Sequence, residues 1–328
     1  MAAEIGEQPR VFERLLAARS VIAQVGDAVR RAAPRFVLLA ARGTSDHAAL
    51  YGKYLVETRL GLPAGLASPS TLTVYGSRPD LHDVLFVAVS QSGSSPDLVD
   101  STAAARACGA LTVAVTNAPD SPLAQVAELQ VDVLAGAELA VAATKTYTAE
   151  LLALHLLLCP GGDPALGRLP EATERTLQAD RSSEVADRLR AAARMVVTAR
   201  GYSYPTAREG ALKLMETSYL SAAAFSGADL LHGPMAMIDT DVPVVAVVSP
   251  GRGGRAMAPV LERLRERRAP VVQVGPGGGL PVDADGLAEE LLPLVEILPL
   301  QRLAWRLAVE HGYDPDRPRG LAKITETW

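Results

Sequence analysis

The sequence predicts an α/β protein made of two tandem doubly wound domains, each with a parallel sheet, followed by an ordered tail. Two observations support this prediction: apolar, strand-like runs alternate with helix-like stretches, and the same succession of runs occurs twice. The runs are apolar on both faces, as expected for parallel strands that helices cover from both sides. A chain of 328 residues is long enough for two domains of common size.

The internal repeat defines the strands. Three runs in the first half have counterparts in the second half at separations of 158 or 159 residues, and a fourth pair matches more loosely. The pairs are Arg35–Gly43 with Arg194–Gly201, Val87–Ser90 with Val245–Ser249, Leu111–Val115 with Pro270–Val274, and Val131–Leu134 with Val295–Leu298. Such constant offsets indicate two domains of one architecture, with a fourth strand expected in each half.

The repeat also sets the expected domain boundaries. We predict a first domain over residues 1–165, a second over 166–310, and a tail over 311–328 that proline and glycine residues hold in a folded-back path. Helix-like stretches lie between the strands, at Ser45–Leu60, Asp97–Ala107 and the charged, amphipathic Arg255–Arg267.

Composition and charge exclude several classes of protein. Hydrophobic residues make up 48% of the chain, which allows real cores, and the net charge of −5 argues against nucleic-acid binding. No apolar run approaches the roughly 20 residues of a membrane span, and the first residues do not resemble a signal peptide. Cys108 and Cys159 lack metal-ligand spacing, so we expect a cytoplasmic protein with reduced thiols and no metal site. Without a dinucleotide fingerprint, we expect no cofactor.

A run of hydroxyl side chains follows the second predicted strand. Ser90, Ser92, Ser94 and Ser95 surround Gly93 where the strand ends and a helix begins. A loop of this kind directs N–H groups and hydroxyls at one point, which suits a dianion such as phosphate. The sequence therefore predicts a phosphate site at this loop.

A second group of hydroxyls follows the first strand, at Gly43-Thr44-Ser45. Ordinary helix capping explains such residues equally well. Because ligands in doubly wound sheets bind at the carboxyl ends of strands, we expect both loops to form one site. The corresponding second-half loop, Ser249–Gly254, has lost the hydroxyl series, so we predict one phosphate site per chain, in the first half.

Proton-transfer groups are concentrated in the second half. Glu209, Lys213 and Glu216 fall at helical spacing on one face, among small and apolar neighbours. A surface salt-bridge ladder would give the same spacing, whereas a buried face would favour a base. His232 precedes a Gly-Pro turn that can fix an imidazole. Lys323, in the tail, is either a Schiff-base amine or a solvated cation.

Seven motifs occur in order along this chain: Glu4–Pro9, Ala41–His47, Ser90–Ser95, Ala137–Lys145, Arg208–Glu216, His232–Asp239 and Asp316–Lys323. Together they resemble the two-domain sugar-isomerase (SIS) family, whose domains are flavodoxin-like. Within the family, the chain is most similar to the isomerase half of glucosamine-6-phosphate synthases and to glutaminase-free glucosamine-6-phosphate deaminases.

The resemblance implies a role for each candidate residue. Glu216 would move a proton between C1 and C2 of a phosphosugar with support from Lys213, and Lys323 would form a Schiff base with the open-chain ketose. His232 would open the sugar ring from the partner subunit, which implies a homodimer. The residues expected to bind the sugar and its phosphate are Thr44, Ser45, Ser90, Gln91, Ser92, Ser95, Val141 and Ala322.

The chain also departs from the synthase pattern. Ala143 stands where synthases carry a Ser, Ser94 replaces a Glu, and Met215 replaces a Lys. No N-terminal cysteine nucleophile is present, so we expect no release of ammonia from glutamine. The first hypothesis is therefore isomerising deamination of glucosamine 6-phosphate to fructose 6-phosphate. The alternatives are dehydration or epimerisation of N-acetylglucosamine 6-phosphate through C2-proton abstraction, and a non-catalytic phosphosugar sensor.

Overall fold

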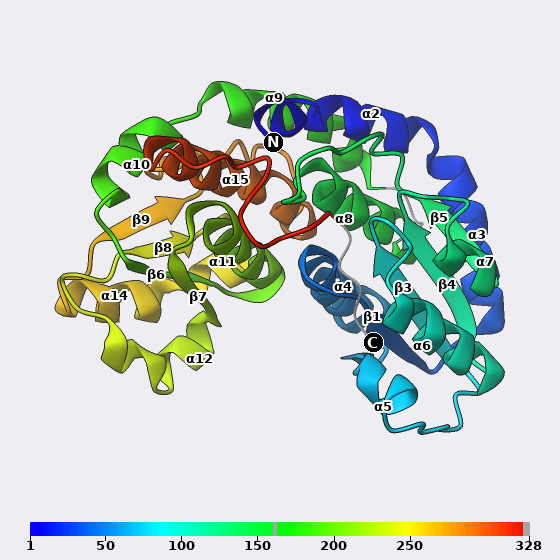
Figure 1. The fold of residues 1–328 in the computed structure, drawn as a ribbon. Helices are drawn as coiled ribbons and strands as arrows, with labels where there is room; N and C mark the ends of the chain where they lie inside the picture. The colour runs from blue at the N-terminus through cyan, green and yellow to red at the C-terminus, as the bar shows by residue number, and fades with distance from the viewer. Residues whose placement is uncertain (160–162, 324–328) are drawn as a thin grey trace. The chain divides into compact units, whose positions relative to one another are not determined.

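The structure, a computed structural model, describes residues 1–159 and 163–323 and divides into two compact units (Figure 1). Of these residues, the five-stranded unit comprises Arg10–Glu138, 145–159, Asp163, Ala322 and Lys323. The four-stranded unit comprises Met1–Pro9, Leu139–Thr144 and Pro164–Leu321. The end of the predicted tail, residues 324–328, lies outside the described residues.

The five-stranded unit contains a wholly parallel sheet. Its strands are β1 (Phe36–Ala40), β2 (Ala64–Leu66), β3 (Val84–Ser90), β4 (Leu111–Thr116) and β5 (Leu129–Asp132). Their order in the sheet is β2-β1-β3-β4-β5, the flavodoxin-like order. The order reverses between β1 and β3, and this switch point is where doubly wound sheets bind ligands.

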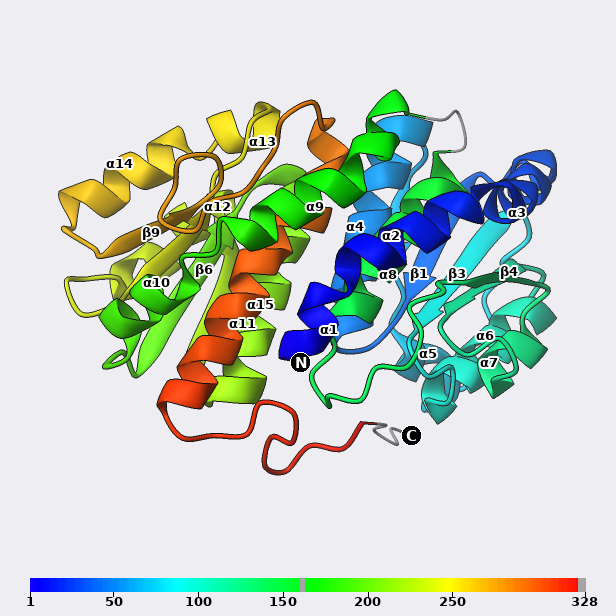
Figure 2. The same cartoon turned by 90° about the horizontal axis from the view of Figure 1, so that it is seen from above.

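Helices cover both faces of this sheet. The helices are α3 (Arg19–Ala32), α4 (Thr44–Leu55), α5 (Pro69–Thr73), α6 (Pro96–Ala107), α7 (Pro122–Val126) and α8 (Lys145–Leu158). α4 packs on the central strands and on α8, while α6 lies over β3 and β4 (Figures 1 and 2). Phe86 and Ala88 of β3 pack in the same buried cluster as Leu98 of α6. Burial on both faces explains why these strands read as continuous apolar runs.

The four-stranded unit repeats this topology with one strand fewer. Its parallel strands are β6 (Arg194–Ala199), β7 (Ser221–Ser226), β8 (Val244–Val247) and β9 (Val271–Val274), in the order β7-β6-β8-β9. Its helices are α1 (Ala2–Gly6), α9 (Leu169–Gln178), α10 (Ser182–Leu189), α11 (Tyr204–Ser218), α12 (Gly227–Leu231), α13 (Arg252–Arg255), α14 (Ala258–Glu266) and α15 (Pro293–Glu310). α2 (Gln8–Ala17) joins the two units.

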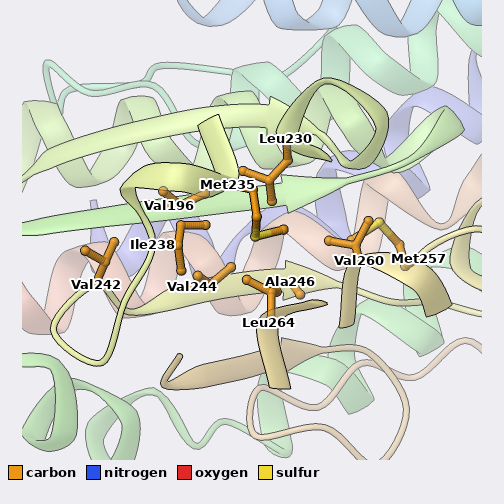
Figure 3. Close-up of a cluster of buried hydrophobic side chains, with 10 residues drawn as sticks. All are labelled: Val196, Leu230, Met235, Ile238, Val242, Val244, Ala246, Met257, Val260 and Leu264. Carbon is orange, nitrogen blue, oxygen red and sulfur yellow. The ribbon is translucent and has the colours of Figure 1, made fainter. Parts of the chain in front are cut away.

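The two faces of this second sheet differ. α11 packs on β6 and β7 and lies beside α15 in both views (Figures 1 and 2). On the opposite face, apolar side chains of α12 and α14 meet those of β6 and β8 (Figure 3). The members of this cluster are Val196, Leu230, Met235, Ile238, Val242, Val244, Ala246, Met257, Val260 and Leu264.

The structure confirms the α/β class with two doubly wound parallel sheets, and it corrects one expected strand. Val295–Leu298, the looser fourth repeat, lies inside the buried helix α15, whereas its partner run overlaps β5. A short apolar run fits a buried helix as well as a strand, and here apolar residues continue through Leu307 with Pro293 in the first turn.

Most expected helices are present with small shifts at their ends. Ser45–Leu60 corresponds to α4 with a π-helical turn at Val56–Leu60, and Asp97–Ala107 lies within α6. The stretch Arg255–Arg267 is divided between α13 and α14. Among the described helices, none combines the length and apolar character that crossing a bilayer requires.

Candidate functional site

The loop after β3 has the geometry expected of a tight anion loop. Gly93 has a φ of +60°, and an added Cβ would lie 2.1 Å from Oγ of Ser121, so only glycine fits. The N–H of Gly93 donates to Oγ of Ser90 at 3.1 Å, and the N–H of Ser94 donates to Oγ of Ser92 at 3.3 Å. These bonds fix the serine side chains around one short turn.

Ser95 occupies the N-cap position of α6. Its hydroxyl makes no capping hydrogen bond to the helix, although serine is a preferred N-cap. Ordinary capping therefore does not account for this hydroxyl, and the positive end of α6 begins directly behind it. Both features are those expected at a phosphate-binding loop.

The loop after β1 lies at the same edge of the sheet, because β1 and β3 are hydrogen-bonded neighbours. Gly43, with a φ of +55°, is the N-cap of α4. Thr44 and Ser45 are already inside the helix, so the interpretation of these two residues as N-caps is wrong. The buried Ser45 donates to Oε1 of Glu150 on α8 at 2.8 Å, which fixes its side chain at the start of the helix.

Glu138 connects two predicted site residues. Its Oε2 atom accepts a hydrogen bond from Nε2 of Gln91 at 3.0 Å and lies 3.2 Å from Nζ of Lys323. Its Oε1 atom accepts the N–H of Thr146 at 3.1 Å. Sequence reasoning missed Glu138, although it lies inside the Ala137–Lys145 motif as the one acidic residue there.

The predicted proton-transfer face of α11 is an ion-pair network. Nζ of Lys213 lies 3.2 Å from Oε1 of Glu209 and 2.5 Å from Oε2 of Glu216. Lys213 and Glu209 are fully buried, and the Glu216 side chain is 21% exposed. Burial lowers the pKa of Lys213, but the two carboxylates outweigh burial and raise it above its usual value. The interpretation as a solvated surface ladder is therefore wrong.

The remaining candidates are distributed over both units. His232 is exposed and ends α12, where Gly233 has a φ of +146°. Within the described ranges its imidazole has no hydrogen-bonding or charged partner. Val141 is half-buried and its N–H donates to the carbonyl of Asp316 at 3.1 Å. Ala322 is exposed beside Lys323.

The second-half loop after β8 holds an anion from its own chain. The N–H groups of Arg252 and Gly253 donate to the two carboxylate oxygens of Glu289 at 2.9 and 2.7 Å. A Cβ at Gly251 would lie 2.3 Å from the carboxyl carbon of Glu289, so this loop is built around that carboxylate. Arg252 and Arg255 are exposed, as expected for a solvated loop.

The structure thus joins the predicted residues into separate groups. Gln91 and Lys323 meet at Glu138 in the five-stranded unit, which also carries both hydroxyl loops. Lys213 and Glu216 meet on α11 of the four-stranded unit, which also carries His232. The first group suits anion and carbonyl binding, and the second suits proton transfer.

Comparison with known proteins places these features in a family. A model of the SIS domain matches residues 33–160 and 188–275. The chain is 36% identical to the isomerizing glutamine–fructose-6-phosphate aminotransferase of Methanothermobacter thermautotrophicus over 342 residues. This match covers 98% of the chain and 56% of the relative, so the chain spans little more than half of that protein.

Two solved structures are also similar. One is a candidate phosphosugar isomerase from Silicibacter pomeroyi, with a TM-score of 0.85 and 36% identity over 96% of this chain and 98% of the other. The other is the C-terminal domain of the glucosamine–fructose-6-phosphate aminotransferase of Francisella tularensis. Its TM-score is 0.84 and its identity 25%, with 97% of both chains covered.

Proposed function

The chain belongs to the SIS-domain family, and on that premise we propose that it is an enzyme that isomerises a phosphosugar. Specifically, we propose that it converts glucosamine 6-phosphate and water to fructose 6-phosphate and ammonia. The observation that carries this proposal is the Glu216–Lys213 pair, a partly exposed carboxylate held by a fully buried ammonium on α11. The name of the Methanothermobacter relative, an isomerizing fructose-6-phosphate aminotransferase, supports the choice of substrate.

The reaction assigns one task to each group. The hydroxyls and N–H groups of the Ser90–Ser95 loop bind the phosphate, and His232 transfers the proton that opens the ring. Glu216 takes the proton from C2 and returns it to C1, which converts the amino aldose to a ketose imine. Water then hydrolyses the imine at C2 and releases ammonia, with Lys323 as the amine that can hold the open-chain ketose.

The test measures ammonia and fructose 6-phosphate released from glucosamine 6-phosphate. Glu216→Gln keeps the side-chain shape but removes the base, so turnover falls roughly 100- to 10,000-fold. Glu184→Gln is the matched control, because Glu184 forms an exposed i,i+3 ion pair with Arg181 on α10 of the same unit. No turnover by the wild type, or equal turnover by Glu216→Gln, would refute the proposal.

A panel of substrates sharpens the assignment. Suppose that N-acetylglucosamine 6-phosphate gives an ultraviolet-absorbing product and glucosamine 6-phosphate releases no ammonia. The function would then be dehydration, with Glu216 as the base, and not deamination. A phosphosugar that binds but stays chemically unchanged would identify a sensor instead. Mass spectrometry of the recovered sugars separates these results.

We further propose a homodimer in which His232 serves the partner's site. The exposure of His232, together with exposed Leu231 and Met237 near it, supports this arrangement. Two inactive variants, His232→Ala and Glu216→Gln, would then complement each other on mixing, because about a quarter of the sites regain both residues. If the two residues serve the same subunit's site, mixing restores no activity.

A further inference from the structure

The buried carboxylate of Glu138 lies where the hydroxyl loop and the C-terminal segment meet. Its side chain is 0% exposed, although burying a carboxylate is unfavourable unless charges and hydrogen bonds compensate. The compensation comes from three separate segments: Gln91 after β3, Thr146 in α8, and Lys323. None of the roles proposed above uses this carboxylate.

The two oxygens of Glu138 have different surroundings. Oε1 is bound by the backbone N–H of Thr146, in the first turn of α8, at 3.1 Å. Oε2 faces two side chains, Nε2 of Gln91 at 3.0 Å and Nζ of Lys323 at 3.2 Å. The backbone bond therefore anchors the carboxylate, and Gln91 keeps Oε2 oriented when Lys323 changes its bonding.

We propose that Glu138 is the proton carrier for Lys323, accepting protons from Nζ so that this amine can form an imine with the C2 carbonyl of a ketose phosphate. This inference deepens the proposed function and rests on it. Glu138 is suited to the task because its Oε2 contacts Nζ, the atom that reacts, and because no reorientation is needed before transfer.

The proton balance closes without another reactant. Nζ starts as an ammonium and gives one proton to Oε2, and the amine then attacks C2. Glu138 passes that proton to the former carbonyl oxygen, takes a second proton from nitrogen, and delivers it to the hydroxyl, which leaves as water. The bond from Nζ to C2 becomes an iminium, and Glu138 ends as a carboxylate beside its positive charge.

A purely structural role would look different. Suppose that Glu138 only tethers the segment that carries Lys323. Glu138→Gln would then form the imine at nearly the wild-type rate, because an amide oxygen still accepts hydrogen bonds from Lys323 and Gln91. The variant loses the ability to take up a proton and also the negative charge that pairs with Lys323; a weaker tether would appear in the dissociation constant, whereas the loss of proton uptake appears in the rate. The rate of imine formation therefore separates the two roles.

The experiment traps the imine. Full-length protein is mixed with fructose 6-phosphate and sodium borohydride, and mass spectrometry follows the adduct on Lys323. In Glu138→Gln we expect trapping to slow about 100-fold, while the dissociation constant for fructose 6-phosphate changes less than about threefold. Glu138→Asp restores part of the rate. Glu128→Gln is the control, since Glu128 accepts a backbone N–H at Thr112 in the same unit.

Each outcome decides between the proposals. Trapping by Glu138→Gln at the wild-type rate overturns the role of Glu138 and leaves the proposed function intact. An adduct in the wild type without ammonia release from glucosamine 6-phosphate overturns deamination and leaves the role of Glu138 intact. No wild-type adduct overturns the imine and the role of Glu138 together. Should Glu138→Gln not fold, Glu138→Asn is compared with Glu138→Asp, which has the same shape but can take up a proton, and equal trapping rates in the two variants overturn the role.

Discussion

The loops after β3 and β8 lie at the same position in two sheets of the same topology, but one is rich in serine and the other in glycine. In the five-stranded unit, Ser90–Ser95 carries hydroxyls around a single obligatory glycine. In the four-stranded unit, the same positions read Ser249–Gly254, and three of the serines are replaced by glycines. The topology is common to both, so the side chains at the switch point decide what each loop holds.

The glycines of the second loop leave room for a carboxylate of the same chain. Glu289 lies against Gly251 and Gly253, and its two oxygens accept N–H bonds from this loop. A serine at position 251 would require the space that the carboxylate occupies. An intramolecular carboxylate thus lies in the second loop where the first loop is expected to bind an external anion, and one phosphate site per chain stays a prediction.

Each unit also buries a group whose pKa burial shifts, a carboxyl in the four-stranded unit and an imidazole in the five-stranded unit. Glu296 of α15 is fully buried near the hydroxyls of Ser203 and Thr206. Burial raises the pKa of Glu296 to about 7. Hydrogen bonds from the neighbouring hydroxyls lower this pKa in part, and the charge of Glu289 raises it slightly. In the five-stranded unit, burial lowers the pKa of His155 to about 4.

The largest expected effect comes from Glu296. Its folded pKa of about 7 lies above the ordinary value of 4.5, so the folded chain holds a proton that the unfolded chain releases. Its contribution is complete below the ordinary pKa and is lost as pH rises through about 7, by on the order of 3 kcal/mol. Urea unfolding at several pH values would show this loss in the wild type and not in Glu296→Gln. Parallel pH profiles of the two proteins would contradict it.

His155 should respond in the opposite direction, with a slightly smaller effect. Its folded pKa of about 4 lies below the ordinary 6.5, so its contribution is complete above 6.5 and is lost as pH falls through about 4. We expect the loss to reach about 2–3 kcal/mol, because this pKa departs from its ordinary value as far as that of Glu296 does but the imidazole is slightly less deeply buried. His155→Gln would remove this acid sensitivity in the same urea series. If the variant loses stability at low pH as the wild type does, another group causes the acid sensitivity and the prediction is wrong.

Exchanging serine and glycine between the two loops tests whether the Glu289 carboxylate defines the second loop. Gly251→Ser places a side chain against Glu289 at a φ of +123°, so we expect a loss of about 2 kcal/mol in the free energy of unfolding. The mirror change, Ser92→Gly, should cost less, about 1 kcal/mol, since it adds chain entropy and removes one long hydrogen bond, from the N–H of Ser94 to Oγ of Ser92 at 3.3 Å. Equal losses in urea unfolding would mean that Glu289 does not define the second loop.

The smallest effect distinguishes the loops by affinity. Ser92→Ala removes a hydroxyl from the predicted phosphate loop and should weaken fructose 6-phosphate binding about tenfold, or 1.4 kcal/mol. Ser249→Ala makes the same change in the other loop, and its binding should stay within about twofold of the wild type. Isothermal titration calorimetry measures both. A larger loss of affinity in Ser249→Ala than in Ser92→Ala would place the phosphate in the second half of the chain and contradict the prediction.

The sequence predicted the repeated strands and the loop positions because burial on both faces leaves a strong apolar signal. It missed β2 and β7, where Ala64–Leu66 is too short and Ser221–Ser226 is rich in alanine, a residue depleted in strands. It also placed a strand at Val295–Leu298, inside α15, since a short apolar run does not distinguish the two structures.

For the candidate site, local spacing predicted the contacts that lie on one element. Lys213 and Glu216 are three residues apart on α11, so helical periodicity was sufficient. Glu138 was missed because its partners Gln91 and Lys323 are 47 and 185 residues away in sequence. Glu289 was missed for the same reason, being 36 residues from Gly253. Only the folded chain brings such residues together.

The most direct test of the proposed chemistry is the fate of the C2 hydrogen. Wild-type protein and Glu216→Gln would be incubated with glucosamine 6-phosphate in deuterium oxide, and NMR would locate deuterium in the product. A base at Glu216 that exchanges with solvent predicts fructose 6-phosphate with deuterium at C1 from the wild type and almost none from the variant. Return of the C2 proton without exchange would leave C1 of the wild-type product free of deuterium, so the contradicting result is product formed by Glu216→Gln at the wild-type rate with the same deuterium content as the wild-type product.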